Sequence, residues 1–307
     1  MGVTVVEVED AGLWVSRLAP LLPREELLLP SQVAGRLAEV DAAFVEGITT
    51  GLERYPNLKF VQCLWAGVDK LLANPDFPSH VAVARMVASS MSQSMAEFVA
   101  ASVLYVHRRF PEYGAQQRDR SWIELSQPVA TDCPVAILGA GVLGSYSATA
   151  LRAIGFPVRL WGRTARPGDP SVLAGVEGLR TLLGSSRIVV NLLPLTPDTV
   201  HIIGAELLAM CSRGVSIINA GRGRHVDDAA LLAALDSGHV DHAVLDVFTI
   251  EPLPDDHRYW THPGVTVMPH IAAASTADAV AESAANGMRA YRSGQPVPSM
   301  VDRTRGY

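Results

Sequence analysis

The chain contains few cysteines, and they are not arranged to bind a metal. Only three occur among 307 residues, Cys63, Cys133 and Cys211, and they lie far apart. An odd number of widely spaced cysteines supplies neither a disulfide framework nor the close pairs of a structural metal site. We therefore expect no metal centre, and a reducing compartment such as the cytoplasm.

Charged residues are also scarce, at 18% of the chain, and the formal net charge is -6. No run rich in Lys and Arg occurs, so neither nucleic acid nor an anionic membrane is favoured as a partner. No apolar run approaches the roughly 18 residues of a membrane helix. Residues 3–6 (VTVV) predict a buried strand rather than a targeting signal. An anionic ligand would need a local positive site.

The length and the 49% hydrophobic content fit two well-buried domains. Short apolar segments alternate with stretches at helical spacing, which predicts an α/β fold with parallel strands. Strands are expected at 3–6, 43–45, 58–61, 80–84, 135–138, 158–161, 188–191, 215–218, 242–245 and 265–267. Helices are expected at 94–109, 145–154, 228–236 and 276–291.

We predict two Rossmann-like or flavodoxin-like domains, each with a doubly wound parallel sheet. The helix at 276–291 comes so late that we expect it to return to the first domain. The predicted substrate domain is therefore 1–100 plus 275–307, with the dinucleotide domain, 101–274, inserted into it.

A glycine fingerprint, Gly139-Ala140-Gly141-Val142-Leu143-Gly144, follows the strand at 135–138 and leads into a helix. Gly139 permits the tight turn, Gly141 lets the backbone approach a pyrophosphate, and Gly144 lets helix and strand pack closely. The N-terminus of the helix expected from residue 145 then faces the phosphates. Val142 and Leu143, which come just before it, are expected to contact the cofactor. The motif alone is weak, but the strand, helix and second strand around it favour a dinucleotide site over an ordinary turn.

The end of the second strand indicates which dinucleotide binds. NAD sites usually carry an acid there for the ribose 2′-hydroxyl. Here Trp161 is followed by Gly162, Arg163, Thr164 and, two residues on, Arg166. Arginines can pair with a 2′-phosphate, which a carboxylate would repel. We expect NADP(H) to be preferred and NAD(H) to be possible, with Arg163 and Thr164 as first contacts. The alternative is that these arginines are merely solvated.

Three later segments each place a reactive side chain beside Gly or Pro after an apolar run. They are Ile218–Gly223 with Arg222, Asp246–Pro252 with Glu251, and Met268–Ala273 with His270. Reduction of a 2-oxo acid adds hydride to the carbonyl carbon and a proton to its oxygen, and histidine suits the proton. Taken singly, each residue fits a turn or a solvated loop. Together they indicate a nicotinamide enzyme acting on a small 2-oxo or 2-hydroxy acid.

With these segments the chain resembles the D-isomer-specific 2-hydroxyacid dehydrogenase family, especially its NADPH-dependent glyoxylate/hydroxypyruvate reductase branch. The matching stretches are Ala66–Asp69, Met95–Val99, Gly139–Gly144, Asn191–Thr196, Asn219–Val226, Leu231–Gly238, Leu245–Pro254, Pro269–Ala273 and Val301–Tyr307. They cover nearly the whole chain, and their order is more specific than any single motif.

The resemblance implies roles for the three reactive side chains. His270 would be the acid/base, and Glu251 would orient its ring and favour the imidazolium. Arg222 would bind the substrate carboxylate and polarise the carbonyl. Arg224 competes for that role, but the family pattern places the catalytic arginine directly before Gly223.

Further contacts are implied by the resemblance alone. Asp246 would bind the nicotinamide carboxamide, while Trp65, Ala66 and Gly67 would form the loop that grips the substrate carboxylate. A homodimer through the dinucleotide domain is also implied. The remaining residues implied to contact the cofactor are Trp161, Leu193, Pro194, Ala220 and Gly221.

The expected activity is NAD(P)H-dependent reduction of small 2-oxo acids, of glyoxylate to glycolate and hydroxypyruvate to D-glycerate. Another D-2-hydroxyacid dehydrogenase, of the phosphoglycerate type, and a non-catalytic dinucleotide-binding regulator stay open. Formate dehydrogenase relatives pair the histidine with glutamine, and Glu251 speaks against them. The sequence leaves the preferred 2-oxo acid unresolved, because one methylene changes binding by only about 1–3 kcal/mol.

Overall fold

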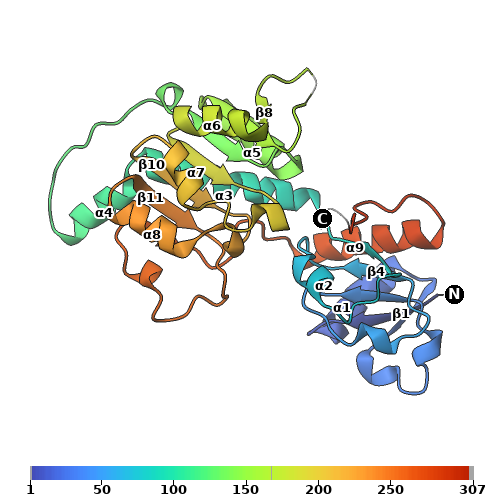
Figure 1. Ribbon diagram of the computed structural model, residues 1–307. Coiled ribbons are helices and arrows are strands. Elements are labelled where there is room, and N and C mark those ends of the chain that lie inside the picture. The colour runs from blue at the N-terminus through green and yellow to red at the C-terminus, as the bar shows by residue number, and fades with distance from the viewer. Residues whose placement is uncertain (1, 167, 304–307) are drawn as a thin grey trace. The chain divides into compact units, whose positions relative to one another are not determined.

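The structure, a computed structural model, describes residues 2–166 and 168–303 (Figure 1). The chain forms two compact units. The first unit is Met1–Ser90 with Ser275–Tyr307, and the second unit is Met91–Ala274. Each has its own parallel sheet, so the predicted α/β class with two doubly wound sheets is confirmed. Residues 1, 167 and 304–307, which fall within the predicted domains, lie outside the described residues.

The units divide after Ser90, whereas the domain boundary predicted between residues 100 and 101 falls inside α3 (Ser89–His107). The packing of α3 explains the difference. Its residues Met95, Val99 and Val103 are buried in a core of the second unit. Nearly the whole helix therefore belongs to that unit.

The unit Met91–Ala274 contains a seven-stranded sheet in the order β12-β11-β10-β9-β6-β7-β8, with all neighbours parallel. The strand order reverses between β6 and β9, as in dinucleotide-binding sheets. The strands are β6 (Val135–Leu138), β7 (Val158–Gly162), β8 (Val172–Ala174), β9 (Ile188–Asn191), β10 (Val215–Asn219), β11 (Val240–Leu245) and β12 (Val265–Val267).

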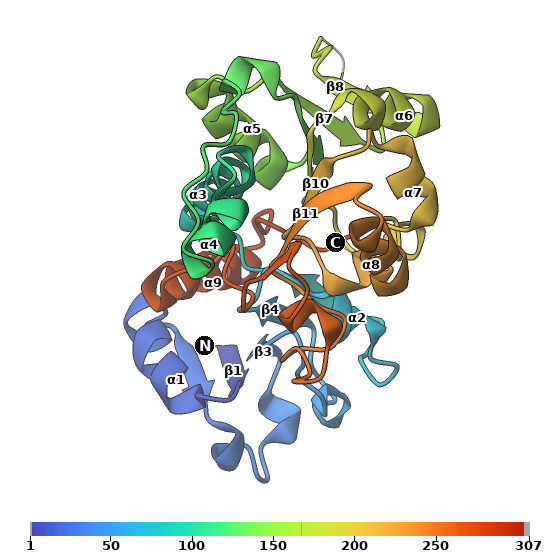
Figure 2. The ribbon, with the colours of Figure 1, turned by 90° about the vertical axis from the view of Figure 1, so that its left-hand side faces the viewer.

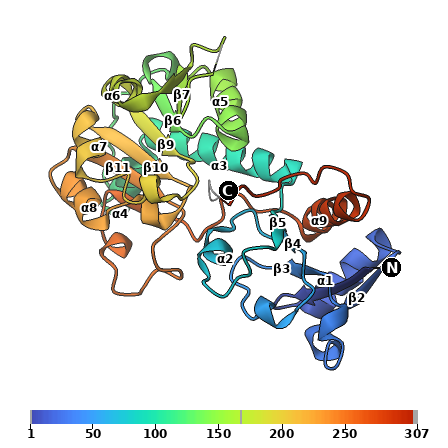
Figure 3. The same cartoon turned by 45° about the vertical axis from the view of Figure 1, so that its right-hand side comes forward.

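Helices cover both faces of this sheet (Figure 3). On one face α3 and α5 (Val142–Ile154) pack against the strands, with α5 contributing Ala148 and Leu151 to the core. On the other face lie α6 (Gly175–Ser185), α7 (Ala205–Met210) and α8 (Asp228–Asp236). The strands are buried from both sides, which explains their continuous apolar sequences.

The other unit has a five-stranded parallel sheet in the order β2-β1-β3-β4-β5, the flavodoxin-like order. Its helices α1 and α9 pack side by side (Figure 2), and Tyr291 of α9 stacks on Phe60 of β4 with ring centroids 4.2 Å apart. The elements are β1 (Gly2–Glu7), β2 (Glu25–Leu28), β3 (Ala42–Val45), β4 (Phe60–Cys63), β5 (Ala82–Ala84), α1 (Ala11–Leu18), α2 (Asp69–Ala73) and α9 (Ala277–Arg292).

Seven α-helices and strands lie where neither is predicted: β2, β8, α1, α2, α4 (Phe110–Arg118), α6 and α7. Both strands are short and lie at sheet edges, so their sequences lack a long apolar run. None of the residues of α4 is buried, so the helix has no apolar stripe to detect. Pro111 lies in its first turn, where proline is tolerated.

Candidate active site

The glycine fingerprint forms the turn between β6 and α5. Gly139 has φ 119°, and a Cβ there would lie 2.9 Å from Leu192 O. At Gly144 a Cβ would lie 1.8 Å from Gly139 O, so only glycine lets the helix approach the strand so closely. At Gly141, by contrast, a Cβ would meet nothing within 4 Å. Gly141 therefore faces open space at the N-cap of α5, as a cradle for a phosphate requires.

The segment after β7 lies beside this turn. Arg166 Nη2 donates to Ala140 O at 2.7 Å and to Ser145 Oγ at 3.4 Å. A Cβ at Gly162 would lie 3.1 Å from Ala140 Cβ. Arg163 and Thr164 are exposed in the same loop. A guanidinium is therefore already in contact with the glycine turn, while the acid typical of NAD sites is absent from the strand end.

The other predicted cofactor residues follow the carboxyl ends of successive strands. Leu193 and Pro194 come after β9, Ala220 and Gly221 after β10, and Asp246 after β11. Because β6, β9, β10 and β11 are neighbours in the parallel sheet, all of these residues lie along the edge that carries the glycine turn. Trp161, in β7, donates its indole N–H to the carbonyl oxygen of Gly175, the residue after β8, at 3.0 Å.

His270 and Glu251 are in direct contact. His270 Nδ1 lies 3.0 Å from Glu251 Oε2, and the backbone N–H of Phe248 donates to Glu251 Oε1 at 2.9 Å. The hydrogen bond to Glu251 raises the pKa of His270, against the opposing effects of burial and of the Arg222 charge. His270 has φ 55°, a conformation uncommon for a residue other than glycine. A protonated imidazole is thus favoured at this position.

Asp246 fixes the turn that carries His270. Its carboxylate accepts the backbone N–H groups of Ile271 at 2.8 Å and Ala272 at 3.0 Å, and its carbonyl accepts that of His270 at 2.9 Å. The side chain is 1% exposed, and burial raises its pKa despite these hydrogen bonds. The structure therefore adds a structural role to the carboxamide contact expected of Asp246.

Arg222 lies in the loop after β10, and its charge acts on His270. Its Nη1 donates to Gly221 O at 2.8 Å. The next residue, Gly223, packs directly on the Glu251 loop, since a Cβ there would lie 1.8 Å from Phe248 C. Arg224 is exposed, whereas Arg222 is half-buried. The loop that bears Arg222 is therefore packed against the loop that bears Glu251.

A buried polar cluster, which the sequence analysis does not predict, lies below Arg222 and is formed by Asn191, Asn219 and His225. Each of these side chains is 0% exposed. A signal for two of them was present, because Asn191 and Asn219 each end a buried apolar strand. A polar residue at the carboxyl end of such a strand lies where ligands bind in doubly wound sheets.

Trp65, Ala66 and Gly67 belong to the other compact unit and form its β4–α2 loop. The Trp65 side chain is 41% exposed. Its ring rests on Gly47, where a Cβ would lie 2.8 Å from Trp65 Cε3. Trp65 N–H donates to Cys63 Sγ at 3.4 Å, and Trp65 O accepts Met86 N–H at 3.1 Å. Trp65 is thus held through both its backbone N–H and its carbonyl oxygen within its own unit.

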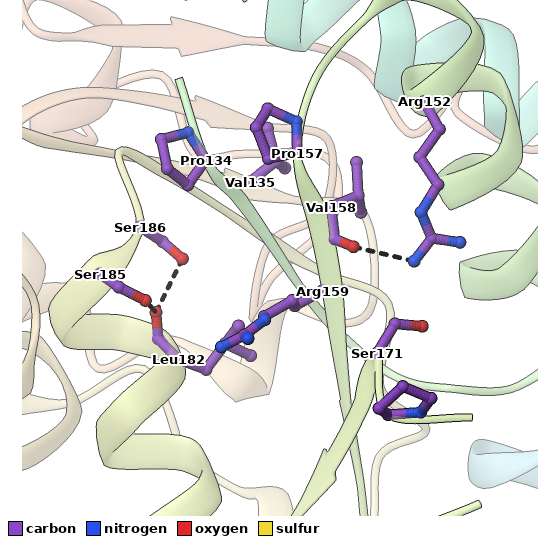
Figure 4. A pocket seen from close by; sticks show the side chains of 11 residues that line it. Pro134, Val135, Arg152, Pro157, Val158, Arg159, Ser171, Leu182, Ser185 and Ser186 are labelled. Atoms are coloured by element: carbon purple, nitrogen blue, oxygen red, sulfur yellow. Dashed lines mark hydrogen bonds between the residues drawn. The ribbon is translucent and has the colours of Figure 1, made fainter. Parts of the chain in front are cut away.

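A cavity of about 610 Å³ lies at the amino ends of β6 and β7, with Pro134, Val158 and Arg159 in its lining (Figure 4). Arg152 Nη2 donates to Val158 O there at 2.8 Å. The glycine turn follows the carboxyl end of β6, so the cavity lies at the opposite edge of the sheet. Ligands of doubly wound sheets bind outside the carboxyl ends. We therefore assign this cavity no part in the chemistry.

The structure describes residues 2–166 and 168–303. Within them we find no helix whose length and apolar character would let it span a lipid bilayer. The same part of the chain contains no group of three or more His, Cys, Asp or Glu side chains placed to hold a metal ion.

Comparison with known proteins identifies the family. Residues 100–272 match the model of the D-isomer specific 2-hydroxyacid dehydrogenase NAD binding domain. The chain is 38% identical to glyoxylate/hydroxypyruvate reductase A of Salmonella typhi over 305 residues, which is 97% of each chain.

Solved structures agree. A D-isomer specific 2-hydroxyacid dehydrogenase from Xanthobacter autotrophicus Py2, in complex with NADPH and MES, gives a TM-score of 0.92 at 38% identity, covering 100% of this chain and 99% of the other. An NADPH-dependent glyoxylate/hydroxypyruvate reductase from Sinorhizobium meliloti, in complex with NADP and sulfate, gives 0.89 at 35% identity, covering 100% of both chains. The chain belongs to the D-isomer-specific 2-hydroxyacid dehydrogenase family.

Proposed function

We propose that this protein is an NADPH-preferring reductase of small 2-oxo acids, reducing glyoxylate to glycolate and hydroxypyruvate to D-glycerate. The observation that carries the proposal is the His270–Glu251 pair, which lies on the sheet edge that carries the glycine turn. Relatives with the names glyoxylate/hydroxypyruvate reductase support the substrate class.

In this proposal each side chain has one task. When bound, the reduced dinucleotide supplies the hydride. Arg222 binds the substrate carboxylate and polarises the carbonyl. His270 donates the proton on Nε2 to the carbonyl oxygen, while its Nδ1 proton remains on the hydrogen bond to Glu251. The loop of Trp65, Ala66 and Gly67 is the remaining contact that we propose for the carboxylate.

The open space at Gly141 fits the pyrophosphate of a dinucleotide. Arg163 and Thr164 are the proposed contacts for the 2′-phosphate. Arg166, in the same loop, contacts the glycine turn through its guanidinium. Val142, Leu143, Leu193, Pro194, Ala220 and Gly221 complete the cofactor site in this proposal, and Asp246 binds the carboxamide.

The test is NADPH oxidation with glyoxylate, hydroxypyruvate, pyruvate and phenylpyruvate, repeated with NADH and with His270→Ala. We expect turnover that prefers NADPH and falls about 10²–10⁴-fold in the variant, the usual contribution of a general acid. Tight NADPH binding without turnover of any of the four acids would reject the reductase and favour a non-catalytic regulator. A preference for NADH would reject the role of the arginines.

We further propose a homodimer through the dinucleotide unit. Between α4 and β6 an extended arm carries large exposed apolar side chains, among them Trp122 at 98% and Ile123 at 59% exposure. Such side chains, when clustered, mark protein interfaces. Light scattering should show a dimer that dissociates in a Trp122→Ser, Ile123→Ser variant but persists in Val176→Ser, which alters a similarly exposed residue of α6. A wild-type monomer would exclude the dimer.

The three cysteines are buried free thiols in the structure, and burial raises the pKa of each, as at Cys133, where it reaches about 11. Their thiolates are therefore scarce at neutral pH. This fits the cytoplasmic location that we propose.

A further inference from the structure

Asn191, Asn219 and His225 form one hydrogen-bonded cluster below the Arg222 loop. Asn191 Nδ2 lies 2.9 Å from Asn219 Oδ1 and 2.9 Å from His225 Nδ1. All three side chains are fully buried. Because a buried polar group is costly unless it is hydrogen-bonded, the cluster depends on every partner being correctly oriented.

Three backbone N–H groups fix those orientations. Leu193 N donates to Asn191 Oδ1 at 3.2 Å, Gly221 N to Asn219 Oδ1 at 3.2 Å, and Arg222 N to His225 Nδ1 at 3.0 Å. A backbone amide can only donate, so each of these side-chain atoms must accept. His225 Nδ1 therefore carries no proton. The ring is the neutral Nε2–H tautomer, and its Nε2 donates to Pro194 O at 3.3 Å.

The cluster holds the main chain of Arg222 from both sides. Its N–H is bound by His225, and its carbonyl accepts Asn219 Nδ2 at 3.1 Å. The fit is tight, because a Cβ at Gly221 would lie 2.8 Å from both Asn191 Nδ2 and His225 Nδ1. The backbone of Arg222 is thereby fixed in an extended conformation, with φ -140° and ψ 151°.

The same cluster reaches the segment that follows β9. His225 donates to Pro194 O, and Asn191 accepts the N–H of Leu193. Beyond the cluster, Ile203 N donates to His225 O at 2.8 Å. One histidine therefore bonds through Nδ1 to the loop of Arg222 and through Nε2 to the segment of Leu193 and Pro194.

Building on the proposed function, we propose that His225 is a positioning residue that links the two binding sites. Through Nδ1 it fixes Arg222 for the substrate carboxylate, and through Nε2 it ties Arg222 to the cofactor segment at Pro194. Asn191 orients the His225 ring, and Asn219 holds the backbone of the Arg222 loop. His225 itself touches neither substrate nor cofactor.

A pair of substitutions separates the two bonds of the ring. His225→Asn places an amide oxygen near the position of Nδ1 but is too short to reach Pro194. His225→Gln reaches Pro194 O with its amide N–H but lacks the acceptor for Arg222 N–H. We expect His225→Gln to lower kcat/KM for glyoxylate by about tenfold to hundredfold, the range that a misplaced binding group causes, with the Kd of NADPH unchanged. We expect His225→Asn to raise the Kd of NADPH and to retain most of kcat/KM at saturating NADPH.

His242→Asn is the matched control. His242 is also buried, with its Nε2 2.8 Å from Thr266 Oγ1, in the same unit. Its loss should lower stability without changing the Kd of NADPH or kcat/KM. Equal kinetic effects in the His225 and His242 variants would show that His225 matters only for folding and would overturn the proposal. An unchanged kcat/KM in His225→Gln would overturn it too.

Nitrogen-15 NMR of wild-type protein labelled at histidine tests the geometry even if the variants fail to fold. We expect a neutral His225 with its proton on Nε2, and a ring protonated on Nδ1 would overturn the proposal. The tautomer and the Kd of NADPH need no turnover. If wild-type protein reduces none of the acids but shows the expected tautomer and Kd changes, the failure lies in the proposed function and not in the link.

Discussion

Glu251 accepts a hydrogen bond on each oxygen, from the N–H of Phe248 and from the Nδ1–H of His270. The first fixes the carboxylate within its own loop, and the second makes the imidazolium more favourable than in water. One oxygen of Glu251 therefore orients the carboxylate, and the other raises the pKa of His270. Asp246 completes the arrangement by binding the backbone of the turn that presents His270.

Substitution Glu251→Gln should shift the pH profile of reduction to lower pH. Reduction needs the protonated ring, so kcat/KM falls as pH rises through the pKa of His270. The hydrogen bond to Glu251 raises that pKa, and the neutral amide removes most of this effect. The decline should therefore begin at lower pH in the variant. An unchanged midpoint in kcat/KM measurements from acid to alkaline pH would show that another group controls protonation.

Substitution Gly162→Asp should weaken NADPH binding relative to NADH. A carboxylate at this strand end repels the 2′-phosphate that we assign to Arg163 and Thr164. Charged hydrogen bonds contribute about 1.5–3 kcal/mol, so the KM for NADPH should rise about tenfold or more.

Gly162→Ala is the control for this change, because its Cβ meets Ala140 Cβ at the same 3.1 Å but carries no charge. If alanine weakens NADPH binding as much as aspartate does, the effect is steric.

Residue-scale features differed in how well the sequence predicted them. Arg222, Glu251 and His270 were recognisable because each stands beside Gly or Pro after an apolar run. His225 was not, because two of its side-chain partners, Asn191 and Pro194, lie more than thirty residues away in the chain. Only the fold brings such groups within hydrogen-bond distance. Asn191 and Asn219, each at the end of a buried strand, were the features of the sequence that could have indicated this cluster.

At the scale of elements, the β6–α5 turn uses its glycines for two different purposes. Gly144 lets α5 pack closely against β6, whereas Gly141 leaves open space for a ligand beside the turn. The first is a packing requirement and the second concerns a ligand. Substitution with alanine should therefore separate stability from binding.

Gly144→Ala should lower the free energy of unfolding by about 1–3 kcal/mol, the usual cost of overpacking, because its Cβ would lie 1.8 Å from Gly139 O. Gly141→Ala should leave that free energy nearly unchanged and weaken NADPH binding, because its Cβ would fill the space proposed for the pyrophosphate. Urea unfolding and fluorescence titration measure the two quantities. Normal NADPH affinity in Gly141→Ala would place the phosphates elsewhere.

Regular elements followed the sequence where local signals were strong. The predicted bounds of β9, β12 and α8 agree with the structure, and α8 begins after Asp227, whose side chain caps Ala230 N–H at 3.1 Å. Helix α5 begins at Val142 instead of 145, since the fingerprint itself supplies its first turn. The strand predicted from residue 58 begins at Phe60, because Leu58 N–H closes a turn on Tyr55 O.

At the scale of the whole molecule, the order of the chain explains why the first unit needs its last helix. Helix α9 follows the inserted dinucleotide unit, yet its Arg292 binds side chains near the chain's beginning. Arg292 contacts Glu25 at 2.9 Å and Asp41 at 2.7 Å, and it donates to Thr4 Oγ1 at 3.2 Å. Glu25 is only 5% exposed. These bonds join α9 to β1 and β2 and to Asp41, the residue just before β3.

Substitution Arg292→Ala should destabilise the first unit while leaving NADPH binding intact. Removal of one partner from a buried ion pair costs about 3 kcal/mol, because Glu25 keeps a buried charge without its counterion. Native-state hydrogen exchange should show faster opening of β1, β2 and β3 but unchanged protection of β6 and β9. Arg289→Ala, on the same helix, loses only exposed bonds to Leu21 and Asn286 and should change little. Equal loss of protection in β6 and β9 would show that the two units unfold together, and stability would then belong to the whole chain and not to each sheet.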